Sequence, residues 1–336
     1  MAQDPVVHYT LTAEDIAAVR GAHGALTDSP LSLRDPRFYD EHWDLTARLS
    51  PSLRRVLEQI RRTEFAAACV LHGYPVSDEA VGPTPSSWSA ALEVPTADHD
   101  VLLAMCGLAL GEPYTWATLQ NSSIIQNLLP MRGDEKRQNG HSSDTFLEFH
   151  TEDGFHPDRC DYLLLFGVRN HDGVPTCLAA VTDVELSPAH RRILSQPRFH
   201  IRPDDEHIRQ LEARHPDSPA LARAIELRDA PPAVAVLSGD PASPYLCIDR
   251  PFMTGADAVA DEALDELMAQ LAAHDRAVVV EQGDLLIVDN YRAVHGRKPF
   301  ISRYDGTDRW LKRMIVSRDL RRAAGARSQD SRRVLF

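Results

Sequence analysis

Apolar residues recur at intervals of three and four in several parts of the chain, which predicts amphipathic helices. The predicted helices cover residues 12–22, a segment that begins at Ser50-Pro51, residues 98–110 and residues 257–273. Serine followed by proline is a common start of a helix, because the hydroxyl caps a backbone N–H group and proline fits the first turn. The first two helices belong to an N-terminal region, about residues 12–66, that we expect to pack outside a sheet.

Short apolar runs bounded by turn residues predict strands. The clearest run lies within residues 161–168, and its unbroken apolarity is typical of a strand that is buried on both faces. Similar runs lie at residues 67–72, 145–152, 233–237, 245–248, 277–280, 284–288 and 310–317. Many strands with a few peripheral helices predict a mainly β protein whose core, about residues 67–318, is a double-stranded β-helix, or jelly roll.

Residues 186–232 are polar and helical, contain several prolines and interrupt the strand pattern. We interpret this segment as an insertion that closes over a site as a lid. Two of its histidines, His207 and His215, are expected to face solvent. Residues 319–336 are rich in arginine and are expected to form an exposed tail, so that residues 1–336 make a single domain.

Composition narrows the possible partners. The formal net charge is −13, which disfavours nucleic acid as a partner because phosphate binding needs a basic face. The 5 cysteines are widely spaced and form no C-x-x-C pair, which argues against a disulfide framework or a structural zinc site. Neither a signal peptide nor a membrane-spanning run is found. We therefore expect a cytoplasmic protein without membrane partners.

The candidate chemistry centres on the segment His150-Thr-Glu152. Strand side chains alternate between faces, so His150 and Glu152 are expected to point the same way. The candidate third ligand is His295, which follows the predicted strand that begins after Gly283-Asp284. Two histidines and one carboxylate form the facial triad of non-haem Fe(II) oxygenases.

Two arginines, Arg309 and Arg313, follow His295 on the last predicted strand. An oxygenase that uses a 2-oxo acid as cosubstrate must anchor the far carboxylate of that acid, and a planar guanidinium provides a bidentate anchor. Arg309 fits this role.

Two interpretations from other classes use the same residues. A zinc hydrolase binds its metal through two histidines and a glutamate, but it has no need of Arg309 and Arg313 and requires a separate general base. A non-catalytic jelly-roll binding protein keeps the fold but loses a ligand, whereas here all three candidate ligands are present.

The motifs His150-Thr-Glu152, Gly283-Asp284, Asn290-x-x-x-x-His295-Gly296-Arg297 and Arg309 together resemble the taurine and 2,4-D dioxygenase (TauD/TfdA) superfamily. The resemblance is to its clavaminate-synthase-like branch, and within it to arginine and asparagine β-hydroxylases of peptide-antibiotic biosynthesis. It covers most of residues 65–320.

This resemblance implies an Fe(II)- and 2-oxoglutarate-dependent dioxygenase with a jelly-roll core. It implies that His150, Glu152 and His295 bind Fe(II), while Arg309 and Thr176 hold the cosubstrate 2-oxoglutarate. O2 is the second cosubstrate.

The resemblance also implies how a small-molecule amino-acid substrate is held. Arg313 is expected to pair with its carboxylate, Gln120 to hold its backbone and Glu152 to meet its α-amine. Ser143, or its neighbour Ser142, is expected to contact it as well.

Asp249 falls where the arginine enzymes place an acid that recognises the side chain of the substrate. Two acids are expected around a guanidinium, but position 247 is Cys. The implied reaction is hydroxylation of free L-arginine or a close analogue, at C3. Citrulline or another polar amino acid, hydroxylation at C4 and desaturation stay open as alternatives.

Overall fold

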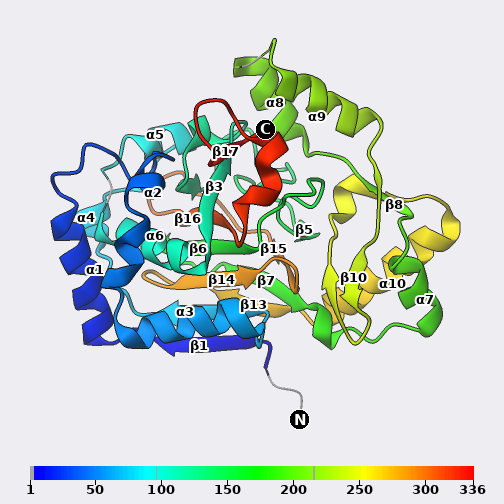
Figure 1. The fold of residues 1–336 in the computed structure, drawn as a ribbon, viewed down its shortest axis with the longest axis horizontal. Coiled ribbons are helices and arrows are strands. Elements are labelled where there is room, and N and C mark those ends of the chain that lie inside the picture. The colour runs from blue at the N-terminus through cyan, green and yellow to red at the C-terminus, as the bar shows by residue number, and fades with distance from the viewer. Residues whose placement is uncertain (1–3, 96, 215) are drawn as a thin grey trace.

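Two β-sheets that pack against each other form the centre of the computed structural model, which describes residues 4–95, 97–214 and 216–336 (Figure 1). The larger sheet follows the path β1 (Val6–Thr10), β2 (Ala68–His72), β14 (Leu285–Asp289), β6 (Tyr162–Arg169), β16 (Trp310–Ser317), β3 (Glu112–Trp116) and β17 (Val334–Leu335), and β4 (Gln126–Leu128) pairs with β16. The smaller sheet follows the path β13 (Arg276–Val279), β7 (Pro175–Ala180), β15 (Ala293–Arg297) and β5 (Leu147–His150). The chain passes from the larger sheet to the smaller between β6 and β7 and again between β14 and β15, as expected of a jelly roll.

Two small sheets and several helices surround this centre. The small sheets contain β12 (Met253–Gly255), β8 (Phe199–Ile201) and β9 (Ala233–Val234), and the hairpin of β10 (Leu237–Asp240) and β11 (Ser243–Leu246). The longer helices are α1 (Ala13–Ala25), α3 (Pro51–Thr63), α6 (Asp98–Leu110), α8 (Asp205–Arg214), α9 (Pro219–Asp229) and α10 (Ala258–Ala273). The shorter ones are α2 (Phe38–Glu41), α4 (Asp78–Val81), α5 (Trp88–Leu92) and α7 (Pro188–Leu194), with 3-10 turns η1 (Trp43–Arg48), η2 (Gln120–Ser122), η3 (Val181–Asp183), η4 (Arg250–Phe252) and η5 (Leu320–Ala326).

Strand β6 shows why the larger sheet must be covered on both faces. Leu164 and Phe166 pack against the buried sides of α1, α3 and α6, whereas Leu163 and Leu165 on the opposite face pack against the smaller sheet. Burial on both faces explains the continuous apolar run in the sequence. The outer face of the smaller sheet is covered in turn by α10, through residues such as Leu264.

The four predicted helices are present as α1, α3, α6 and α10, but the balance of secondary structure differs from the expectation of a mainly β protein. Helices account for more of the described residues than strands do, because the insertion and the N-terminal region are both helical. Strand β1 was not predicted, although its run of β-branched and aromatic residues is typical of a strand, and it extends the larger sheet by pairing in parallel with β2. The run at residues 233–237 is divided between β9 and β10.

The expectation of an exposed tail after residue 318 is wrong. Strand β17 pairs in parallel with β3 and lies beside it in Figure 1. Leu335 in this strand is fully buried. Arg333 is also buried, because its guanidinium donates to the backbone oxygen of Pro113 and pairs with Asp40. The segment therefore ends in a buried strand that Arg333 helps to fix, although other arginines in it, such as Arg321, are exposed.

The insertion at residues 186–232 is helical as predicted, with α7, α8 and α9 arranged around β8. Pairing of β8 with β12 ties this insertion to the rest of the molecule, and α8 and α9 lie side by side at the upper edge of the view in Figure 1. Among the described residues, no helix is both long and apolar enough to cross a bilayer.

A buried ion pair joins α6 to β16. The Lys312 ammonium donates to Asp100 at 2.5 Å and meets Nε2 of His99 at 3.0 Å, and all three residues are buried. Burial alone would raise the pKa of Asp100, but the Lys312 charge lowers it to about 2. Asp100 also caps the helix by accepting from the Ala97 N–H group. The pair therefore fixes the helix layer against the strand that follows Arg309.

Replacing Lys312 with methionine should lower the free energy of unfolding by about 3–5 kcal/mol, because the Asp100 carboxylate would be left buried without a cation. Urea unfolding followed by circular dichroism measures this loss. The matched control is Lys298→Met, since Lys298 is exposed and pairs loosely with Asp275, and there the loss should stay below about 1 kcal/mol. Equal losses in the two variants would contradict the role of the buried pair.

Candidate active site

A pocket between the two sheets collects most of the residues that the sequence assigned to a site. The smaller sheet, the start of β16, the segment before β6 and helix α8 all contribute to its lining. The predicted residues that line it are Gln120, His150, Glu152, Thr176, Asp249, His295, Arg309 and Arg313.

The pairing of β15 with β5 brings the candidate metal ligands together. His295 is the direct partner of His150 in this antiparallel ladder, and the centroids of their rings lie 4.3 Å apart. Glu152 lies beyond the end of β5, in a turn, and its Oε2 is 3.3 Å from Nε2 of His295. One ligand atom from each of the three residues lies within 4.8 Å of the others, which is a separation that one metal ion can bridge.

The protonation of His150 suits a metal ligand. Its Nδ1 lies 2.8 Å from the backbone oxygen of Glu148, which can only accept, so Nδ1 carries the proton and Nε2 keeps its lone pair. Burial and the neighbouring His295 lower the pKa of His150 to about 4, so the ring is neutral near neutral pH. A metal-binding imidazole needs this tautomer, and a second bond from its other nitrogen orients the ring.

The carboxylate of Glu152 is held in its ionised form. Burial would raise its pKa, but the Arg313 guanidinium and the two histidines outweigh burial and keep the pKa well below its usual range. Arg313 donates to Glu152 and also to Oε1 of Gln126, a pocket residue that the sequence did not single out. Arg313 therefore connects the candidate metal ligand to the larger sheet.

Arg309 and Thr176 meet on the other side of the triad. Nη2 of Arg309 donates to the Thr176 hydroxyl at 3.3 Å, while its buried Nε has no partner in the described residues. Burial and the nearby Arg297 lower the pKa of Arg309 to about 9. Arg297 is buried too, donates to the Ser142 hydroxyl at 2.7 Å and has one Nη without a partner among the described residues. Two buried guanidinium groups with unused donors form a site for an anion.

Gln120 reaches the pocket from a turn with unusual backbone geometry. Gln120, Asn121 and Ser122 all have positive φ angles, of 42°, 58° and 59°, a conformation that residues other than glycine seldom adopt. The Gln120 side chain bonds both backbone groups of Asn127, at 2.8 Å each. This clamp holds the turn against β4.

Two predicted substrate contacts are placed differently from expectation. Ser143 is fully buried beside Asp144 and does not belong to the described lining of this pocket. The Ser142 hydroxyl accepts a hydrogen bond from Arg297, which lines the pocket. The Arg132–Ser143 loop turns Ser143 inward because its backbone N–H group bonds Glu135.

Asp249 supplies an acid to the pocket next to the triad. It forms an isolated backbone bridge with His150, and its carboxylate has no hydrogen bond or ion pair among the described residues. Burial, together with the nearby carboxylates of Asp204 and Glu152, raises its pKa well above its usual value. Cys247 points away from the pocket, since its thiol donates to the Gly154 backbone oxygen. A cation that entered the pocket would favour the ionised form of Asp249.

His207 does not face solvent as the sequence suggested, and His215 lies outside the described residues. His207 is 5% exposed, lines the pocket from α8 and contacts the Thr118 hydroxyl at 2.7 Å through Nδ1. Its Nε2 lies 3.4 Å from Asp153, the residue after Glu152, and its ring packs edge-on against Phe155. The insertion therefore rests on the turn that carries a candidate ligand.

The arrangement can now be compared with known proteins. The family described as "Taurine catabolism dioxygenase TauD, TfdA family" matches residues 96–315, which is well over half of the chain. The chain belongs to this family. Membership of this family decides against the two other interpretations of these residues, a zinc hydrolase and a non-catalytic binding protein. The protein is an Fe(II)- and 2-oxoglutarate-dependent dioxygenase of the amino-acid hydroxylase type.

Two curated TauD/TfdA-type relatives cover nearly the whole chain. The enduracididine beta-hydroxylase of Streptomyces hygroscopicus is 38% identical over 97% of this chain and 98% of its own length. The L-ornithine/L-arginine 3-hydroxylase of Catenulispora acidiphila is 34% identical, with the same coverage of both chains.

The fold is that of the non-haem iron oxygenase OrfP. A crystal structure of OrfP with Fe, succinate and (3S)-hydroxy-L-Arg superimposes with a TM-score of 0.90 at 35% identity, covering 98% of this chain and 99% of OrfP. OrfP has also been solved with Fe and alpha-ketoglutaric acid. The pocket fits an iron ion, because it offers a His-Glu-His donor set. It also fits alpha-ketoglutaric acid, because Arg309 offers a buried guanidinium whose Nε has no partner among the described residues.

Several pocket residues were not predicted from the sequence, among them Gln126, Arg297 and His207. Arg297 stands inside the quoted His295-Gly296-Arg297 motif, so the motif contained a signal that was not used. Gln126 and His207 reach the pocket only through long-range packing, and nothing in their local sequence marks them.

Replacing Arg309 with glutamine should weaken 2-oxoglutarate binding by at least roughly 30-fold, because the loss of a buried charged partner costs about 2–5 kcal/mol. The KM for 2-oxoglutarate in succinate formation measures this effect. Arg303→Gln is the control, since Arg303 is exposed and pairs with Asp172 at the surface. An unchanged KM for 2-oxoglutarate in the Arg309 variant would show that Arg309 does not bind the cosubstrate.

Raising the pH should loosen α8 through His207. Burial would lower the pKa of His207, but Asp153 and Asp204 raise it above its usual value, against the opposing effect of Arg313. Because the pKa is raised, protonated His207 stabilises the folded state. This stabilisation is fully present below about pH 6.5, the usual histidine value, and is lost as the pH rises through the pKa of His207 in the folded state.

Hydrogen exchange of the α8 amides at about pH 6 and about pH 8.5, corrected for intrinsic rates, measures this change. His207→Gln keeps a group that can bond Thr118 but cannot be protonated, so its exchange should not depend on pH in this way. His200→Gln is the control, since His200 bonds the Pro231 backbone oxygen elsewhere in the insertion. The same pH dependence in His207→Gln would exclude His207 as its source.

Proposed function

We propose that the protein hydroxylates C3 of a free L-amino acid with a guanidinium side chain, either L-arginine or a close analogue. The observation that carries this proposal is the carboxylate of Asp249, which lies half-buried beside the triad and has no hydrogen bond or ion pair among the described residues. The relatives support it, since their names specify arginine, ornithine and enduracididine as substrates.

In this proposal His150, Glu152 and His295 hold Fe(II), and Arg309 with Thr176 holds the distal carboxylate of 2-oxoglutarate. The bound metal supplies the activation of O2 that couples the conversion of 2-oxoglutarate to succinate and CO2 with insertion of one oxygen atom into a C–H bond. Arg297 adds a second positive charge to the cosubstrate end of the pocket.

Two contacts suggest how the chain orients its substrate. Arg313 touches Glu152, and Asp249 bridges to His150, so the two residues flank the triad. An amino acid whose carboxylate meets Arg313 and whose cationic side chain meets Asp249 must pass over the triad. The carbons between its two ends, C3 among them, would then face the metal. Gln120 and Gln126 border the carboxylate end of this path.

The polypeptide also limits access of water. Helix α8 lies over the pocket through His207, whose neighbours are Thr118, Phe155 and Asp153. Holding substrate in one orientation and excluding solvent confines the reaction to one C–H bond.

One observation favours a second candidate, a neutral ureido substrate such as citrulline. The raised pKa of Asp249 permits its carboxyl group to be protonated in the free enzyme, and a neutral carboxyl can both donate to and accept from a ureido group. A guanidinium would instead draw Asp249 into its ionised form.

The test is succinate formation by the purified enzyme with Fe(II), 2-oxoglutarate and O2, in the presence of arginine, homoarginine, ornithine, enduracididine or citrulline. Mass spectrometry of each product identifies the gain of one oxygen atom. We expect coupled hydroxylation with arginine or another guanidinium-type substrate. Preference for citrulline would favour the neutral alternative, and no succinate above background with any amino acid would contradict the proposal.

The Asp249→Asn variant separates recognition from structure. It should lower kcat/KM for arginine by at least roughly 30-fold, the cost of losing one partner of a buried charge pair, and should affect citrulline much less. Asp265→Asn is the control, since Asp265 is exposed and pairs with Arg250 at the surface. Equal losses for both substrates would show that Asp249 is structural.

A further inference from the structure

Glu152 lies outside any strand, although a metal ligand must be placed accurately. Strand β5 ends at His150, and the turn that follows contains Asp153 with a left-handed φ of 52°. Thr151 is held by backbone bonding to Ile248, but within the described residues no backbone group of another strand bonds Glu152. Its main chain must be fixed by something other than a sheet.

Asn290 provides that support. Its side chain is fully buried, and its Oδ1 accepts from the Glu152 N–H group at 2.7 Å. Its Nδ2 donates to the Glu152 backbone oxygen and to the Cys160 backbone oxygen, at 3.0 Å each. Because one amide bonds both backbone groups of Glu152, it fixes the direction of that residue's main chain as well as its position.

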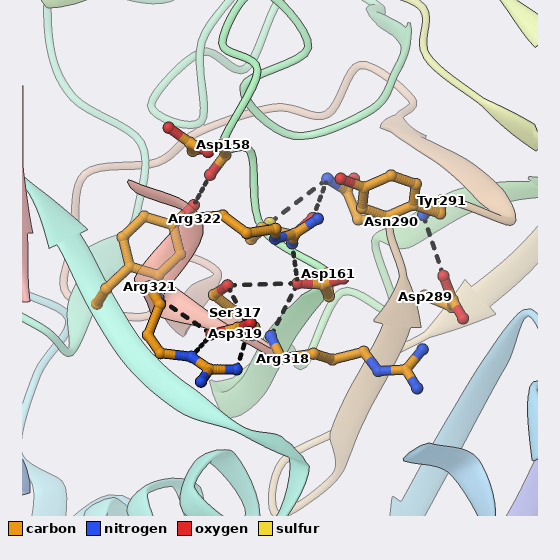
Figure 2. Close-up of polar contacts among 12 residues, drawn as sticks. Asp158, Asp161, Asp289, Asn290, Tyr291, Ser317, Arg318, Asp319, Arg321 and Arg322 are labelled. Carbon is orange, nitrogen blue, oxygen red and sulfur yellow. Dashed lines mark hydrogen bonds and ion pairs between the residues drawn. The ribbon is translucent and has the colours of Figure 1, made fainter. Parts of the chain in front are cut away.

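The backbone of Asn290 is itself firmly placed. It lies in the turn that joins β14 to β15, the strand that carries His295. Its N–H group donates to the Asp161 backbone oxygen at 2.9 Å. The Asp161 carboxylate accepts from the Arg318 N–H group at 2.8 Å and from Arg322 at 3.0 Å, and Figure 2 shows this cluster gathered beside Asn290. The turn is therefore tied to both β6 and β16.

We infer that Asn290 is a positioning residue that fixes the carboxylate of Glu152 relative to the imidazole of His295, an inference that rests on the proposed Fe(II) site. The two candidate ligands come from distant parts of the sequence, and the Asn290 side chain holds the Glu152 backbone from the turn that leads directly into β15, the strand of His295. Only an amide can do so, because the position requires one acceptor and two donors at once. An aspartate lacks the donors, and an apolar residue lacks both.

The chain offers a matched control in Asn170, which lies after β6 on the way to β7. Its Oδ1 accepts from the Val174 N–H group, and its Nδ2 donates to the backbone oxygens of Val174 and Val280, all at 3.0 Å. Asn170 is also buried, but it does not belong to the described lining of the pocket. Removing either side chain breaks the same three kinds of bond.

The experiment measures Co(II) binding to the metal-free protein by visible absorption, without turnover. Asn290→Ala should weaken Co(II) binding by about 10–100-fold, the usual effect of losing a group that orients a metal ligand. Asn170→Ala should bind Co(II) as the wild type does, although both variants should lose comparable thermal stability. If Asn290→Ala does not fold, Asn290→Ser, whose hydroxyl keeps one bond, should give a smaller weakening in the same direction.

Two outcomes separate this inference from the proposed site. Wild-type Co(II) affinity in the Asn290 variant, or equal weakening in both asparagine variants, would overturn the positioning role. Retention of wild-type Co(II) affinity by His295→Ala would instead refute the metal site itself.

Discussion

The pairing of β15 with β5 is the constraint on which the site depends. It sets His295 opposite His150, and a shift of one residue would turn every side chain of β15 to the other face of the sheet. The ladder is irregular just beyond this pair, between His295 and Arg297, where Gly296 lies against the backbone oxygen of Leu147. A side chain at position 296 would have no space, so glycine at this point keeps the two histidines in register.

Charge in the pocket is divided between its two ends. Arg309 and Arg297 lie buried with unused donors, which makes one end suitable for a dicarboxylate. Asp249 also lines this pocket and has no ion pair among the described residues, whereas Arg313 and Glu152 pair with each other. In the proposed reaction, Arg309 and Arg297 face the dicarboxylate cosubstrate, and the cationic side chain of the amino acid meets Asp249.

Much of this could be predicted from the sequence, because local patterns reflect local causes. The continuous apolar run of β6, the helix capped at Ser50 and the close spacing of His150 and Glu152 all follow from burial, capping and proximity in the chain. The alternation of a strand, however, does not account for Glu152, which lies in a turn. Its orientation depends on Asn290, a contact across the fold that periodicity does not reveal.

The parallel pairing of β17 with β3 has a consequence for folding during synthesis. Strand β3 leaves the ribosome early, whereas β17 contains residues near the end of this sequence. The edge of β3 with which β17 pairs therefore has no partner until β17 has been synthesised, and an unpaired edge can associate with other chains. Addition of β17 is therefore a late step in the assembly of the larger sheet.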